Sequence, residues 1–111
     1  MNKKWQELKN EILGENFNLS LVYATNRLIR KLNKIYRKKD KPTTVLSFPL
    51  SKKDGEIFLN LALIKKEKIN LDYLFIHSLL HLKGFRHGVK MEKKEKSIFK
   101  KFYGKKNYNR Y

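Results

Sequence analysis

The chain has 111 residues, and its 27 lysines and arginines against 10 acidic residues give a formal net charge of +17. One domain fits this length, and two full domains are excluded. An apolar fraction of 41% and an aromatic fraction of 13% exclude a disordered basic tail, and the absence of cysteine excludes disulfides and metal sites built on thiolates.

The excess of positive charge favours a polyanionic partner, because each Lys or Arg beside a phosphate releases condensed counterions. Nucleic acid is therefore the expected partner class, although a lysine-rich composition without functional meaning would give the same charge. No run approaches the ~20 apolar residues of a membrane-spanning helix, and no signal-peptide pattern opens the chain. We therefore expect a cytoplasmic protein with no membrane partner.

Hydrophobic periodicity, caps and turn residues predict the following elements in chain order. They are a helix over 3–13, a strand over 17–23, a helix from a cap at 25 or 26 to the basic run 37–39, strands over 43–48 and 56–61, and helices over 71–83 and 89–103. The segment 62–67 is compatible with a short helix or with a simple connection.

The order of these elements predicts an α+β domain in which a small, mostly antiparallel sheet packs against helices. The strands over 43–48 and 56–61 are separated by a short loop rich in turn residues, which favours an antiparallel pair. The helix over 71–83 is apolar on nearly all sides and carries two histidines, so we expect it to be central and buried.

The three histidines of the chain fall at 77, 81 and 87, within eleven residues. His77 and His81 are four apart on one helix, which places both imidazoles on one face, about one turn apart. Gly84 permits the chain to reverse, so that His87 can return as a third ligand. This spacing predicts a metal site of three histidines with an open fourth position.

Zinc is the expected metal, one ion per chain, because neutral imidazole suits it, although nickel or copper could occupy the same ligands. A fourth protein ligand would have to be Asp or Glu. Ser78 stands where a thermolysin-like peptidase carries its general-base Glu, which argues against a peptidase. A metal-activated water is then the expected chemical centre, and cleavage of a phosphodiester would also need a cation such as Arg beside the phosphoryl oxygens.

Two long stretches of the chain resemble the YbeY family of bacterial endoribonucleases. Residues 77–88, HSLLHLKGFRHG, are similar to the family pattern H-G-x-L-H-L-x-G-Y-D-H. Residues 32–49, LNKIYRKKDKPTTVLSFP, are similar to L-N-x-x-Y-R-x-K-D-K-P-T-D-V-L-S-F-P, and the GEI at 55–57 matches a G-D/E-I strand start. The resemblance covers residues 18–103 in the family's order.

The resemblance implies an α+β fold, zinc held by His77, His81 and His87, and single-strand-specific endoribonuclease activity. It places the enzyme in maturation of small-subunit ribosomal RNA and in ribosome quality control, with the small subunit, and a ribosomal protein or an assembly GTPase, as partners. Arg37 matches the family's arginine implicated in RNA handling, and with His77 it forms the expected catalytic set. The expected RNA-binding residues are Arg37, Lys38, Lys39 and Lys41.

We expect a single domain over 1–111, with an N-terminal helical segment over 1–17, the YbeY-like core over 18–103 and a basic flexible tail over 104–111. Two positions depart from the family pattern, because Arg86 and Thr44 each replace an Asp. Both changes favour the alternative of a noncatalytic, metal-stabilised ribosome-assembly factor that binds RNA.

Overall fold

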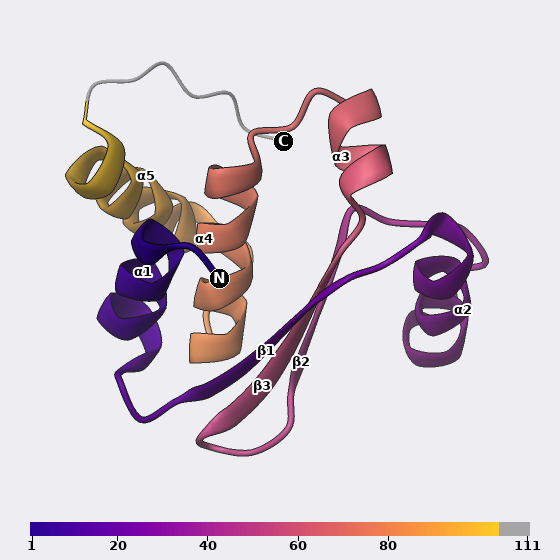
Figure 1. The fold of residues 1–111 in the computed structure, drawn as a ribbon, viewed down its shortest axis with the longest axis horizontal. Helices are drawn as coiled ribbons and strands as arrows, with labels where there is room; N and C mark the ends of the chain where they lie inside the picture. Colours follow the sequence, from indigo (N-terminus) through magenta and orange to yellow (C-terminus); the bar gives the residue numbers. More distant parts are fainter. Residues whose placement is uncertain (105–111) are drawn as a thin grey trace.

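Helices and strands are mixed up to residue 59 of residues 1–104, the part of the chain that this computed structural model describes, and only helices follow (Figure 1). The elements are α1 (Lys3–Leu13), β1 (Asn18–Tyr23), α2 (Asn26–Arg37), β2 (Val45–Pro49), β3 (Asp54–Leu59), α3 (Leu61–Lys66), α4 (Leu71–Lys83) and α5 (Val89–Tyr103). The expected α+β class is confirmed, and the segment left open at 62–67 is mostly helix. The predicted basic tail falls, from residue 105 on, outside the described residues.

Side-chain caps fix where α1, α2, α3 and α4 begin, whereas α5 has no such cap. An asparagine precedes α1, α3 and α4, and in each case its side chain accepts a hydrogen bond from a backbone N–H in the first turn. Thr25 does the same for α2, accepting from the Leu28 N–H at 3.1 Å. Such caps satisfy N–H groups that have no partner within the helix, which explains why local sequence predicted the starts of α1, α2 and α4 closely.

The sheet is mixed, with strand order β1-β3-β2, and not mostly antiparallel as expected. The β2–β3 hairpin is antiparallel as predicted, whereas β1 pairs in parallel with β3. Helix α2 connects β1 to β2. The hairpin then reverses the chain, and β3 runs in the direction of β1 and lies between β1 and β2. Of these two strand pairings, local sequence predicts only the antiparallel one, through the turn residues of the hairpin. Pro49 is tolerated in β2 because β2 lies at an edge of the sheet.

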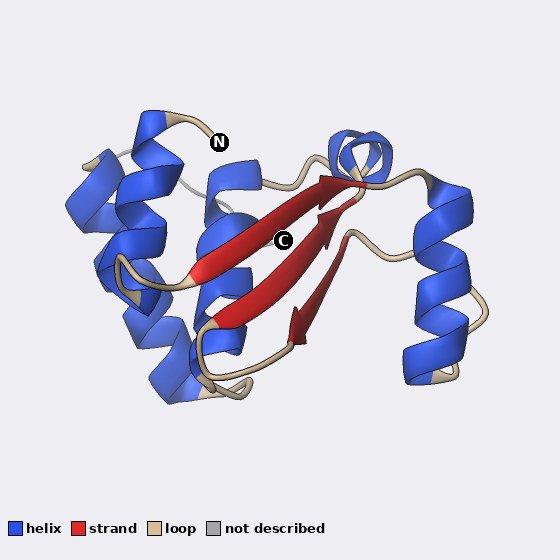
Figure 2. Ribbon diagram, turned by 60° about the horizontal axis from the view of Figure 1, so that its bottom comes forward, coloured by secondary structure: helices blue, strands red, loops and turns tan. Residues whose placement is uncertain are grey.

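Helices α1, α4 and α5 lie together on one side of the sheet, and α2 lies apart at the other end of the molecule (Figures 1 and 2). Helix α4 is the centre of the main core, since residues 73–80 are all buried. Trp5 of α1 stacks on Phe75 of α4 with ring centroids 3.9 Å apart. The expected central position of the histidine-bearing helix is therefore confirmed.

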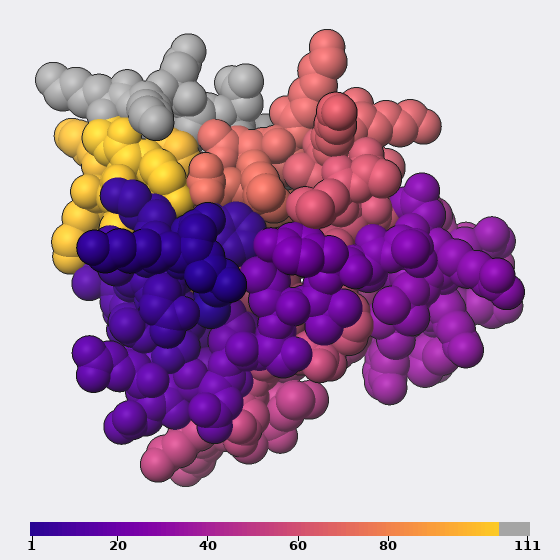
Figure 3. Space-filling model, in the orientation of Figure 1, coloured from indigo at the N-terminus to yellow at the C-terminus, as the bar shows by residue number. Residues whose placement is uncertain are grey.

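Helix α2 is less buried than its apolar periodicity predicts. Ile29 is fully buried, in a small cluster with Ala24 and Leu46, but Ile35 and Tyr36 are 56% and 64% exposed. The space-filling view shows this part of the chain, in purple, as a lobe that projects at the right (Figure 3). Within residues 1–104, no helix has the length and apolar character needed to cross a membrane.

Candidate metal centre

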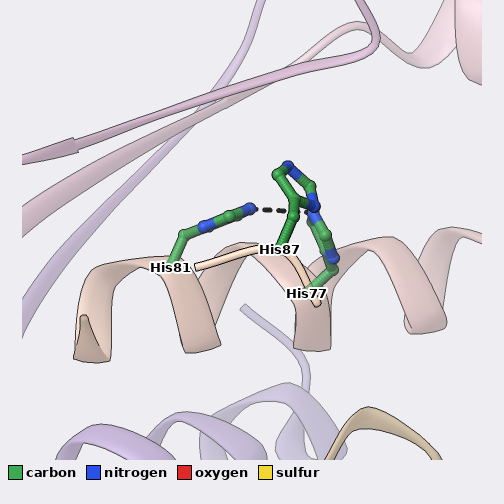
Figure 4. Close-up of side chains that lie close together, drawn as sticks. All are labelled: His77, His81 and His87. Atoms are coloured by element: carbon green, nitrogen blue, oxygen red, sulfur yellow. Dashed lines mark hydrogen bonds between the residues drawn. The ribbon is translucent and has the colours of Figure 1, made fainter. Parts of the chain in front are cut away.

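The three histidines come together at one end of α4. His77 and His81 project from successive turns of the helix, and His87 follows the loop that leaves it (Figure 4). Gly84 ends α4 in the left-handed conformation at φ 112°, where the Phe85 N–H bonds back to the Leu80 carbonyl at 3.0 Å. One ligand nitrogen from each histidine lies within 4.8 Å of the others, so this cluster could hold a metal ion.

The hydrogen bonds behind two of the rings determine which nitrogens face one another. His81 Nδ1 lies 3.0 Å from the Phe85 carbonyl, which can only accept, so Nδ1 carries the proton. His77 Nδ1 contacts Glu95 Oε2, whose carboxylate likewise accepts. The two Nε2 atoms, 2.9 Å apart, are then both lone-pair acceptors. Two such atoms repel unless a cation lies between them, so the donor set fits a bound metal ion.

Burial also favours the ligand form of the central histidine. Loss of solvent lowers the pKa of His81 below its ordinary value, and the neighbouring His77 lowers it further; the Phe85 carbonyl opposes this in part, and the remaining effects, of His87 and Glu95, are smaller. His81 is therefore neutral near pH 7, as a metal ligand must be.

The histidines form one wall of a pocket of about 370 Å³. Its other lining residues are Arg37, Thr43, Thr44, Val45, Ser47 and Leu74. The predicted Arg37, at the end of α2, is thus brought to the histidines from forty residues earlier in the chain. The predicted Lys38, Lys39 and Lys41 are exposed on the adjoining loop and lie outside the pocket lining.

Two buried asparagines hold the loop that forms the far wall of this pocket. Asn33, 1% exposed, donates from Nδ2 to the Lys41 carbonyl at 2.9 Å. The backbone N–H of Asn60, a fully buried residue, donates to the Thr44 carbonyl at 2.9 Å. Sequence reasoning assigned neither residue a role, although an asparagine within the apolar stripe of α2 was a visible signal.

Glu95 is a further residue that sequence reasoning missed. It lies on α5, is 1% exposed and contacts both His77 and, at 3.4 Å, the Tyr73 hydroxyl. The signal was its spacing, since Met91, Glu95 and Phe99 recur at four-residue intervals on the buried face of the helix. Arg86, by contrast, is exposed, and Thr44 lines the pocket.

Comparison with known proteins shows which family this chain is similar to. The family model described as Endoribonuclease YbeY matches residues 1–103. An Endoribonuclease YbeY of Ehrlichia canis is 42% identical over 82 residues, covering 62% of this chain and 53% of that protein. The namesake of Aquifex aeolicus is 34% identical over 113 residues, covering 86% and 75%.

The chain spans about half the length of the Ehrlichia relatives it matches. A solution structure from Thermotoga maritima superposes with a TM-score of 0.57 at 24% identity, covering 92% of this chain and 81% of that one, which shows a shared fold. With the family model matching nearly all of the described residues, the chain belongs to the YbeY family.

Proposed function

We propose that this protein is a zinc-dependent endoribonuclease that cleaves single-stranded RNA in the maturation of small-subunit ribosomal RNA and in ribosome quality control. The observation that carries the proposal is the pocket that three histidines and Arg37 line together. The relatives are named endoribonucleases, which supports the same reaction class.

Zinc fits the donor set better than a hard cation, because imidazole nitrogen suits zinc whereas magnesium and calcium prefer oxygen ligands. His77, His81 and His87 would hold it, leaving one position of a tetrahedron open. When bound, zinc supplies the Lewis acidity that activates water near neutral pH.

Arg37 is the proposed phosphate clamp. Its guanidinium presents several N–H donors in one plane, matches two phosphoryl oxygens at once and stays charged at any relevant pH. As a residue that lines the same pocket as the histidines, it would neutralise the charge that develops on the phosphate during cleavage.

The burial of His77, the one buried histidine of the three, favours a single-stranded substrate. His77 is 5% exposed, so a scissile phosphate must enter the pocket, which a flexible strand can do more readily than a rigid duplex. Lys38, Lys39 and Lys41 would bind neighbouring phosphates beside the entrance, and the formal charge of +17 would attract the strand. Such binding weakens steeply as salt rises.

A noncatalytic assembly factor is the second candidate. Thr44 lines the pocket at a position where the family pattern has an Asp, so this wall lacks a carboxylate. On this alternative the metal stiffens α4 and the basic surface docks on precursor ribosomal RNA, without cleavage.

Cleavage of a single-stranded RNA by zinc-loaded protein tests the proposal. Arg37→Ala should reduce cleavage and retain zinc, whereas Arg27→Ala, an equal loss of charge at another exposed position of α2, should have little effect. Zinc binding without cleavage would favour the assembly factor. The product ends separate two routes, because attack by water leaves no 2′,3′-cyclic phosphate, whereas attack by the ribose 2′-hydroxyl leaves one.

A further inference from the structure

Glu95 is a buried acidic residue directly behind the metal centre. It lies on α5, and its carboxylate contacts His77 Nδ1, on the side of the ring opposite the Nε2 that faces His81. At 1% exposure such a carboxylate is costly to bury unless it is paired with donors. The Tyr73 hydroxyl at 3.4 Å is a further donor to the same carboxylate.

We propose that Glu95 is a positioning residue, which accepts the Nδ1 proton of His77 and so fixes the tautomer and ring orientation that present Nε2 to the metal. This inference rests on the proposed metal site. A neutral histidine carries its proton on either nitrogen, and only the Nδ1–H form leaves Nε2 able to bind a cation. The carboxylate thus selects the ligand form of His77 before metal arrives.

The two helical histidines are held in different ways. His81 donates to the Phe85 carbonyl, a backbone group that no substitution removes. His77 depends on a side chain from another helix, so the pairing of α4 with α5 through Glu95 determines the geometry of this ligand. Glu95 also places a negative charge one imidazole away from a site whose three ligands are all neutral, and this charge strengthens cation binding.

The negative charge of Glu95 matters more because of Arg86. The residue before the third histidine is a cation here, and it adds positive charge to the loop that carries His87. Within residues 1–104, the group of side chains that could together hold a metal ion consists of the three histidines. Glu95 therefore lies behind one of these ligands and is not itself a ligand.

The test compares Glu95→Gln with the wild type in two measurements. The first is Zn²⁺ affinity, measured by competition with a chromophoric chelator, which should fall about 10- to 100-fold, as for other carboxylates that hold a metal-binding histidine. Glu67→Gln, the same change at an exposed position after α3, is the control and should bind as the wild type does.

The second measurement is the tautomer of His77 in metal-free protein, read from long-range proton–nitrogen NMR spectra. We expect Nδ1–H at both His77 and His81 in the wild type, and loss of the single tautomer at His77 alone in Glu95→Gln. A role confined to folding would leave the tautomer unchanged.

Zinc affinity within twofold of the wild type in Glu95→Gln, or an Nε2–H tautomer at His77 in the wild type, would overturn the inference. If Glu95→Gln does not fold, the wild-type spectrum decides. A wild type that binds no zinc but shows the expected tautomer would overturn the proposed zinc site and the role of Glu95 toward the metal, whereas zinc binding with the wrong tautomer would overturn the inference about Glu95 alone.

Discussion

Asp72 joins three helices of the main core, and its removal is a direct test of how α4 is held. Its carboxylate accepts from the Trp5 indole N–H of α1 at 2.7 Å and from the Tyr103 hydroxyl of α5 at 3.0 Å. Asp72 also lies in the first turn of α4, where a negative charge interacts favourably with the helix dipole. The substitution Asp72→Ala removes all three interactions.

The magnitude follows from which partners lose a hydrogen bond. Trp5 is 3% exposed, so its indole N–H would lose the Asp72 acceptor in a largely buried position, at a cost of about 1–3 kcal/mol. Tyr103 is partly exposed and can turn to water, which limits its loss to about 0.5–1.5 kcal/mol. The helix dipole adds about 0.3–1 kcal/mol. Together these predict a loss of roughly 2–5 kcal/mol, and at about 4 °C per kcal/mol for a chain of this size, a fall in Tm of roughly 8–20 °C.

Urea denaturation of the metal-free protein measures this loss, and a double-mutant cycle with Trp5→Phe isolates the indole bond. We expect the loss in free energy of unfolding caused by Asp72→Ala to be smaller in the Trp5→Phe background than in the wild type, by at least about 1 kcal/mol. Asp72→Asn should be milder, because its amide oxygen can still accept from the indole. A free energy of unfolding for Asp72→Ala within about 0.5 kcal/mol of the wild type would refute the reasoning.

Three further predictions concern the site and the hairpin. His81→Ala should abolish zinc retention, and full zinc stoichiometry in that variant by elemental analysis would contradict the three-histidine site. Arg37→Ala should keep the zinc affinity of the wild type but weaken RNA cleavage or binding, and unchanged values for both in a filter-binding and cleavage assay would remove Arg37 from the mechanism. Hydrogen bonds from Ser51 and Asn18 lower the pKa of Asp54 below its ordinary 3.8, so Asp54 stabilises the fold above that pH and the contribution disappears as pH falls through the folded value. Ser51→Ala should therefore be less stable than the wild type at pH 6 and approach it near pH 2, and a difference independent of pH would contradict this.

The parts of the fold that were predictable are those set by neighbours in sequence. Helix α4 has the bounds predicted for it because Asn70 caps its start and Gly84 ends it, both through local backbone chemistry. The β2–β3 hairpin followed from its turn residues. The parallel pairing of β1 with β3 brings together residues 36 apart in sequence, and no local pattern encodes it.

Burial was harder to predict than helix formation. Leu28, Ile35 and Tyr36 recur at the spacing of a core-facing helix, yet all three are exposed. Helix α2 meets the rest of the molecule through a small cluster around Ile29. Periodicity reports that a helix has an apolar stripe and does not report how much of that stripe another element covers.

The candidate site likewise has parts that local sequence predicts and parts that it does not. The spacing of His77, His81 and His87 with an intervening glycine was enough to predict their convergence. The role of Arg37 at this site was predicted through the family resemblance, since nothing local brings the end of α2 to the pocket that the histidines line. Glu95 escaped notice because it lies in a segment of alternating charges, where a carboxylate is ordinarily solvated.

The most direct test of the central claim is the metal content of the purified protein, measured together with cleavage of a single-stranded RNA before and after treatment with a chelator. We expect one zinc per chain, cleavage that the chelator abolishes, and recovery when zinc is restored. Protein that carries one zinc per chain and leaves the RNA intact, or that cleaves equally well after the metal is removed, would contradict it.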